Sequence, residues 1–158
     1  MRDAALRREL LALLDGGHAH VAAGKAFAGL APRLRGVRPD GGGHSAWELL
    51  EHLRIAQEDI LRYVLDPGWK SPSWPEGYWP PPGAPTAKRW GTSLRAFVRD
   101  LEAVKELVRD PARDLTAPLP QARQHTVLRE VLLVADHNAY HLGQVVEVRR
   151  RLGAWGTD

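Results

Sequence analysis

Cysteine is absent from this chain of 158 residues. Its absence excludes a disulfide framework, and it also excludes thiolate metal ligands and a protein thiol as the nucleophile of a reaction. Any metal site in this chain must therefore be built from other donors, of which the seven histidines are the most promising.

Long apolar runs are absent as well. No segment reaches the roughly eighteen consecutive apolar residues that indicate a membrane-spanning helix. Residues 1–14 carry charges every few positions, unlike the apolar centre of a signal peptide. We therefore expect a cytoplasmic protein that does not bind a membrane.

Charge of one sign is not concentrated anywhere, although the formal net charge is +3 and the pI is near 9.6. Most arginines are interleaved with Asp and Glu. The one run, Arg149–Arg151, comes where cations stabilise the negative end of a helix. We expect no nucleic-acid partner, and the length fits a single domain over residues 1–158.

Glycine and proline clusters divide the chain into helical blocks, and no segment has the alternation of a convincing strand. The blocks are residues 2–14 with a continuation over 18–30, then 45–65, 87–108 and 126–152. Ser45 and Glu48 predict a capping box, Thr126 the N-cap of the last helix and Gly153 its terminator. The sequence therefore predicts an all-α protein, an antiparallel four-helix bundle.

His137 and His141 stand four residues apart within the last predicted helix. This spacing places both imidazoles on one helical face and is typical of metal ligands. The same stripe should face the interior, where an unpaired polar group costs about 1–3 kcal/mol. A metal is one partner that removes this cost, and hydrogen bonds to other groups are the alternative.

A zinc-like site needs at least a third protein ligand. His52 is the best candidate, because it alone among the remaining histidines lies inside a second strongly periodic helix. His44 lies just before the helix that contains His52 and is expected to cap that helix or face solvent; the alternative is that it approaches the site from the start of the helix. His125 is expected to face solvent. His18 and His20 stay outside the predicted site, since a spacing of two splays them apart on a helix.

Several stretches resemble the DinB/YfiT-like superfamily of metal-binding four-helix-bundle proteins. They span nearly the whole chain and are residues 16–20, 44–53, 74–80, 136–144 and 152–155. The resemblance implies that a divalent metal is bound by His52, His137 and His141. It also implies that relatives include S-transferases and isomerases that use a thiol such as bacillithiol, mycothiol or glutathione, and that relatives are often homodimers.

The connection over residues 66–85 is longer than a bundle requires, and it contains seven prolines and four large aromatic residues. Loops of this length are usually functional or disordered. Under one interpretation, the aromatic residues close one end of the bundle as a plug. Under the other, the loop covers the metal, and Trp74, Tyr78 and Trp79 bind a small organic substrate.

Three neutral imidazoles leave at least one coordination position open. A divalent ion there lowers the pKa of a bound thiol or water, and imidazole suits zinc, nickel, copper and iron alike. The leading hypothesis is a metal-dependent transferase that joins a low-molecular-weight thiol to a small electrophile. Gln144, one turn beyond His141, is expected to orient a ligand or a bound water.

Two other functions stay open at this point. A metal-dependent hydrolase would use the same triad, but no obvious carboxylate lies on the histidine stripes to act as its base. A non-enzymatic metal-binding or ligand-binding stress-response protein needs only the bundle and the triad. We also expect a homodimer, because apolar stripes such as Leu6, Leu10, Leu13 and Leu14 favour a two-fold interface if one bundle does not bury them.

Overall fold

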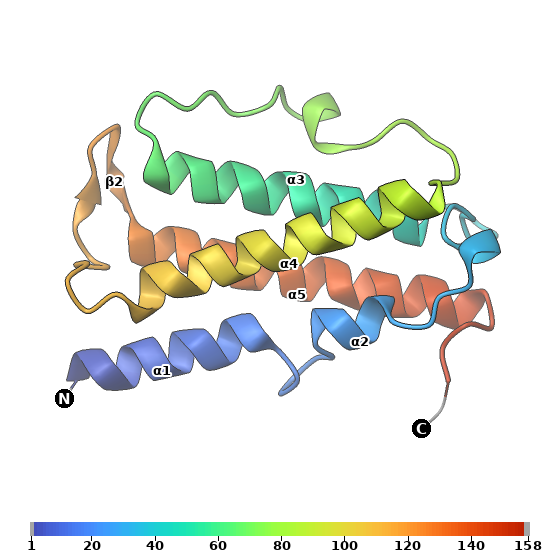
Figure 1. Ribbon diagram of the computed structural model, residues 1–158, viewed down its shortest axis with the longest axis horizontal. Helices are drawn as coiled ribbons and strands as arrows, with labels where there is room; N and C mark the ends of the chain where they lie inside the picture. The colour runs from blue at the N-terminus through green and yellow to red at the C-terminus, as the bar shows by residue number, and fades with distance from the viewer. Residues whose placement is uncertain (1, 157–158) are drawn as a thin grey trace.

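Within residues 2–156, which the computed structural model describes, the chain forms five helices and one small hairpin (Figure 1). The helices are α1 (Arg2–Asp15), α2 (Ala23–Phe27), α3 (Ala46–Leu65), α4 (Ala87–Arg109) and α5 (Val127–Arg151), and two 3-10 turns cover Pro32–Leu34 and Glu76–Tyr78. The predicted all-α fold is confirmed. None of these helices combines the length and the apolar character that crossing a bilayer requires.

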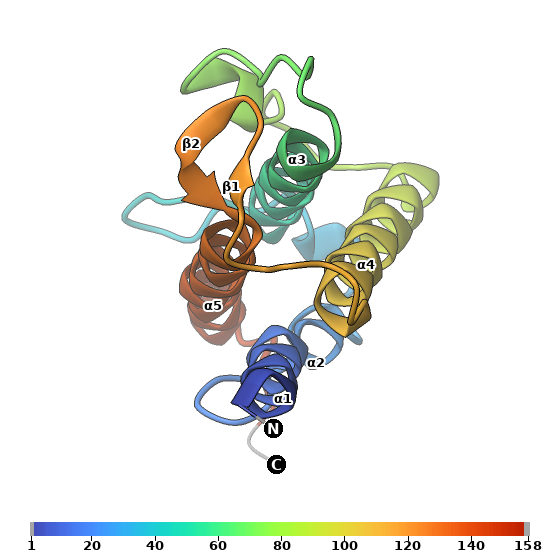
Figure 2. The same ribbon diagram turned by 90° about the vertical axis from the view of Figure 1, so that its left-hand side faces the viewer.

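The four long helices occupy the corners of a diamond when seen end-on (Figure 2). α3 packs against both α4 and α5, and α1 packs against the same two helices from the opposite corner. α3 and α4 run in the same direction, whereas α1 and α5 run the other way (Figure 1). Because parallel neighbours cannot be joined by a tight turn, the chain returns along the outside of α3, and this crossover explains the length of residues 66–85.

Local sequence fixes both ends of α3. The Ser45 hydroxyl accepts a hydrogen bond from the Glu48 amide at 3.2 Å, and the Glu48 carboxylate accepts one from the Ser45 amide at 2.8 Å. The predicted capping box is therefore present. The helix ends at Leu65, shortly before Pro67. These limits place His52 inside the helix, where it is only 3% exposed.

The boundaries of α5 also follow the prediction. The Thr126 hydroxyl accepts a hydrogen bond from the Arg129 amide at 3.1 Å and caps the start of the helix. Beyond the other end, Gly153 has a φ of 63°, a left-handed conformation that glycine adopts without steric cost. The 25 residues between these signals carry both His137 and His141.

The predicted continuation of the first helix over residues 18–30 is wrong. Only Ala23–Phe27 is helical in this stretch. Gly16 and Gly17 have φ angles of 67° and 84°, and Gly29 has a φ of 67°, so glycines interrupt the backbone on both sides of the short helix. The first corner of the bundle is therefore completed by a bent connection and not by one long helix.

The expectation of no strands is also wrong at one end of the bundle. β1 (Pro118–Leu119) and β2 (Ala122–Thr126) pair as an antiparallel hairpin. Polar residues dominate β2, so the sequence lacked the alternation that indicates a strand. His125, which was expected to face solvent, is half-buried there, with its Nδ1 3.0 Å from the Tyr63 hydroxyl and 3.4 Å from Glu130.

The hydrophobic core has two parts separated by a polar layer. One part includes Leu61, Val104 and Val131, and the other includes Trp47, Phe97 and Leu142. Between them, Gln57 donates a hydrogen bond to the Phe97 carbonyl at 2.7 Å and accepts one from Asn138 at 2.9 Å. Since buried polar groups require partners, this layer holds α3, α4 and α5 in a fixed register.

The bundle core buries only part of the leucine stripe on α1 that could serve a two-fold interface. Leu10 and Leu14 are 4% and 6% exposed, whereas Leu6 and Leu13 are 38% and 47% exposed. Only half of the stripe is therefore available to a second copy of the chain.

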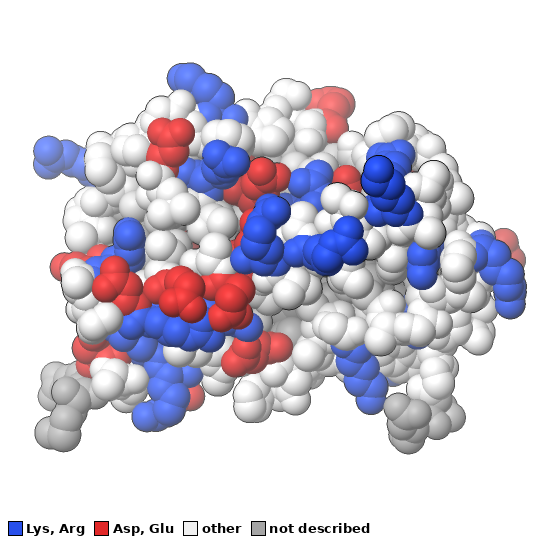
Figure 3. All heavy atoms as spheres, viewed as in Figure 1, with Lys and Arg blue, Asp and Glu red and all other residues white. Residues whose placement is uncertain are grey.

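Charged side chains gather along the edge formed by α1 and α4, where red and blue groups lie side by side (Figure 3). The Lys105 ammonium lies 2.5 Å from Asp15, and the Arg109 guanidinium lies 2.6 Å from Glu106. Exposed pairs of this kind contribute little to stability. Their mixed signs leave no field of one sign along this edge.

Candidate metal centre

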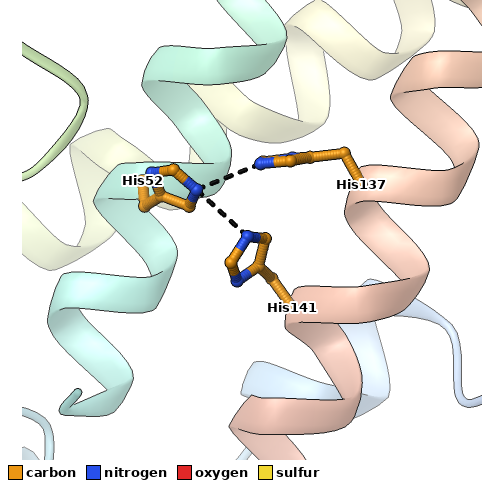
Figure 4. Close-up of side chains that lie close together, drawn as sticks. All are labelled: His52, His137 and His141. Carbon is orange, nitrogen blue, oxygen red and sulfur yellow. Dashed lines mark hydrogen bonds between the residues drawn. The ribbon is translucent and has the colours of Figure 1, made fainter. Parts of the chain in front are cut away.

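Three histidines from two helices meet between α3 and α5 (Figure 4). The Nε2 atom of His52 lies 3.0 Å from Nε2 of His137 and 3.1 Å from Nε2 of His141. Ligand atoms of all three lie within 4.8 Å of one another. The structure thus brings together the three residues that the sequence predicted, in an arrangement that can hold a metal ion.

The spacing of the residues produces this convergence. His137 and His141 follow one another by one turn on α5 and present their rings to the same side. His52 reaches toward them from the facing helix, α3 (Figure 4). His52 and His141 are 3% and 8% exposed, and His137 is half-buried. Packing therefore holds the three rings in place, and the cluster is least covered at His137.

Hydrogen bonds at the opposite ring nitrogens determine which nitrogen carries the proton. His52 Nδ1 donates to the Tyr78 carbonyl at 3.0 Å, and His141 Nδ1 donates to the Gln144 side-chain oxygen at 2.8 Å. A neutral imidazole has a single N–H, so Nε2 of each ring is left with a lone pair. Such outer hydrogen bonds are typical of metal-bound histidines, because they orient the ring and raise its basicity.

The histidines are neutral at neutral pH. Burial, together with the neighbouring imidazoles, lowers the pKa of His52 to about 4, although the hydrogen bond to Tyr78 opposes the shift, and the same two causes lower the pKa of His137 to about 3. Burial also lowers the pKa of His141. The 3.1 Å contact between His52 and His141 therefore brings two lone pairs together without a proton between them. A cation at this point removes the repulsion, so the donor set fits a metal ion.

Trp79 holds the ring of His52 in place. The two rings are stacked with centroids 3.9 Å apart and an interplanar angle of 3°. On its other face, Trp79 stacks against His44 at 3.9 Å and 13°. The expectation that His44 caps α3 or faces solvent is therefore wrong, because Ser45 caps the helix and the half-buried His44 ring packs on Trp79.

Asp59 ties the crossover loop to α3. One carboxylate oxygen accepts a hydrogen bond from the Trp69 indole at 2.7 Å, and the other accepts one from the Tyr78 hydroxyl at 2.6 Å. Burial and the Asp59 carboxylate raise the pKa of Tyr78 to about 12. The loop is therefore anchored where the Tyr78 carbonyl meets His52. Sequence reasoning missed Asp59, although a carboxylate two turns beyond His52 on the same helix was a usable signal.

A cavity of about 460 Å³ opens beside the three histidines. Its walls come from α3, α5 and the crossover loop, and they include the predicted substrate-binding residues Trp74, Tyr78 and Trp79. Tyr140 lies on the same wall, with its ring 4.9 Å from that of His141. The loop therefore lies beside the histidine cluster and forms a wall of this cavity, as the second interpretation of its sequence expected. Substrate binding by Trp74, Tyr78 and Trp79 stays a prediction.

Other residues singled out in the sequence serve the fold. Glu48 accepts hydrogen bonds from Ser45 and Arg38, and although burial raises its pKa, these contacts lower the pKa to about 2. His20 Nδ1 bonds to the Val21 carbonyl at 2.9 Å, and His18 is exposed. Neither His18 nor His20 belongs to the histidine cluster.

A family model of the DinB superfamily matches residues 5–145. The chain belongs to the DinB superfamily. The matched region contains His52, His137, His141 and Gln144, so the whole histidine cluster lies within the family's domain. No curated protein and no solved structure matches the chain.

The lowered pKa values predict how the metal-free DinB chain responds to acid. Unfolded histidines titrate near the ordinary value of 6.5, whereas folded His52 and His137 take up protons only near pH 4 and pH 3. The unfolded state therefore binds more protons in this window, and the free energy of unfolding falls as the pH falls from 6.5 toward 3. Urea denaturation of chelator-treated protein at several pH values measures the slope.

The variant His137→Gln should flatten this pH dependence, because it removes one of the buried imidazoles. His18→Gln changes an exposed histidine and should leave the slope as in the original chain. Equal slopes in all three proteins would show that the cluster does not resist protonation.

Proposed function

We propose that this DinB superfamily chain binds one divalent metal ion through His52, His137 and His141 and catalyses transfer of a low-molecular-weight thiol to a small electrophile. The observation that carries the proposal is the convergence of three neutral imidazoles beside a cavity of about 460 Å³. Three protein ligands leave an open position, as in catalytic metal sites and unlike closed structural ones. The cavity offers room for a substrate at that position.

A divalent ion bound by imidazoles lowers the pKa of a thiol beside it and so favours the nucleophilic thiolate near neutral pH. Zinc, nickel and iron all suit this donor set. The residues of the chain supply orientation. The Tyr78 carbonyl and Gln144 hold the rings of His52 and His141, and the crossover loop shields one side of the site from water.

The bonds, electron pairs and protons of the proposed transfer balance. A sulfur–carbon bond forms between the thiol and the electrophile, the leaving group departs with its electron pair, and the thiol proton passes to solvent. This chemistry agrees with the family resemblance, which implies that relatives include thiol-dependent S-transferases.

Hydrolysis is less well supported, because the cavity lacks a free general base. Asp59 is the one carboxylate among the residues that line the cavity, and both of its oxygens accept hydrogen bonds from loop aromatics. A base must be free to take a proton from water. The geometry therefore favours thiol transfer over activation of water.

Removal of any one ligand should abolish stoichiometric metal binding. We expect His52→Ala, His137→Ala and His141→Ala each to lose the bound ion, because two imidazoles do not hold a divalent ion tightly between two helices. Elemental analysis of protein purified without an affinity tag gives the stoichiometry. Full metal content in all three variants would exclude this triad.

Two further substitutions extend the same metal-binding experiment, one with an intermediate expected effect and one as a control. Gln144→Ala removes the hydrogen-bond acceptor of His141 and should weaken metal affinity roughly 10–100-fold without abolishing binding. His18→Ala removes an exposed histidine outside the cluster and should bind metal like the original chain.

Catalysis is tested by incubating metal-loaded protein with 1-chloro-2,4-dinitrobenzene and, in turn, bacillithiol, mycothiol and glutathione. We expect conjugation above the uncatalysed rate with at least one thiol, and a return to the uncatalysed rate after chelation or in His137→Ala. Stoichiometric metal without acceleration of any thiol would leave a metal-binding protein and refute the transferase.

The proposal also includes the oligomeric state, which is a homodimer. Leu6 and Leu13 are the exposed apolar side chains of α1 that a two-fold interface would cover. Light scattering at micromolar concentration should give the mass of a dimer, which is twice the 17.5 kDa mass of the chain. The substitution Leu13→Glu should weaken the dimer and shift the measured mass toward that of the monomer. A monomer at every accessible concentration would contradict the dimer.

A further inference from the structure

The cavity beside the histidines offers no free charge to a ligand. No Lys or Arg is among the residues that line it. Its one carboxylate, Asp59, is already hydrogen-bonded through both oxygens. An anionic group entering the cavity would lose its water and meet no Lys or Arg there, and a cationic group would meet only the Asp59 carboxylate, whose oxygens are already engaged.

The aromatic side chains of the cavity differ in what they can still contact. Trp79 has both ring faces covered, one by His52 and the other by His44. The hydroxyl of Tyr78 is engaged by Asp59. These two side chains therefore organise the metal centre and have little surface left for a ligand.

Trp74 and Tyr140, in contrast, have side-chain surface free to contact a ligand. They are 74% and 65% exposed, the highest values among the large hydrophobic side chains of the described chain. Trp74 lines the cavity from the crossover loop, and Tyr140 lines it from α5. Leu133, which is 37% exposed, adds an apolar surface on the same helix as Tyr140. The cavity thus has an aromatic rim on two sides.

We propose that this cavity selects an uncharged aromatic molecule, whose ring packs against Trp74 and Tyr140. Flat rings gain favourable contacts with exposed aromatic side chains in stacked or edge-on geometry. The absence of free charge in the lining then disfavours aromatic acids and amines. This inference rests on the proposed function only in taking the occupant to be the electrophilic acceptor, and it makes Trp74 and Tyr140 the determinants of specificity.

A set of unreactive probes tests the selection separately from catalysis. The probes are 1-naphthalenemethanol, which is uncharged, 1-naphthoate, which is anionic, and 1-naphthylmethylammonium, which is cationic. Isothermal titration calorimetry is performed on the full chain with and without zinc. In the metal-free chain, where no ion attracts the carboxylate, the uncharged probe should bind about tenfold more tightly than either charged probe.

Two substitutions locate the bound probe. Trp74→Ala and Tyr140→Ala should each raise the Kd for 1-naphthalenemethanol about tenfold. Both side chains are largely exposed, so the fold should persist in the variants. The matched control is Leu132→Ala, which truncates an exposed apolar side chain of α5 that does not line the cavity and should leave the Kd unchanged.

Three outcomes would overturn the selection: equal binding of charged and uncharged probes, original affinity in both variants, or no saturable binding at millimolar concentration. A rim buried between two copies of the chain would appear as a dimer that Trp74→Ala dissociates and that excludes the probe, which also refutes the proposal. Probe binding without thiol conjugation would refute only the transferase. Conjugation of charged acceptors without probe binding would refute only the aromatic selection.

Discussion

The site depends on one constraint, which is that the lone pairs of buried imidazoles converge where no protein proton lies between them. The Tyr78 carbonyl and Gln144 accept the Nδ1 protons of His52 and His141, and burial keeps the rings neutral. The Nε2 atoms of these rings then face one another at 3.1 Å. Such an arrangement is unfavourable in isolation, and a cation makes it favourable. The packing of α3 against α5 therefore holds the three histidines in a geometry that could accept a metal ion.

The crossover loop connects the topology of the bundle to this chemistry. Because α3 and α4 are parallel, the chain must travel back along α3 (Figure 1), and residues of this segment line the same cavity as the three histidines. Asp59 anchors the loop at two points, Tyr78 accepts from His52, and Trp79 stacks on the same ring. A segment required by connectivity thus also orients His52, one of the three candidate metal ligands, and forms a cavity wall.

Local signals in the sequence predicted the features that nearby residues determine. The Ser45–Glu48 pair defined the start of α3, and the four-residue spacing of His137 and His141 predicted their shared face. Features that depend on distant contacts were not predictable in this way. The Trp79 stack needs the path of the crossover loop, and the hairpin over residues 118–126 lacks apolar alternation. Periodicity identified His52 as the best third partner of His137 and His141, and the family resemblance added the implication that these three residues bind a metal.

X-ray absorption spectroscopy of the zinc-loaded chain tests the central claim most directly, because it reports the ligand atoms and their distances. The account predicts three imidazole nitrogens at about 2.0–2.1 Å with one further light atom, and loss of the imidazole signature in His137→Ala. Zinc surrounded by oxygen alone, or an imidazole count that does not change in His137→Ala, would contradict it.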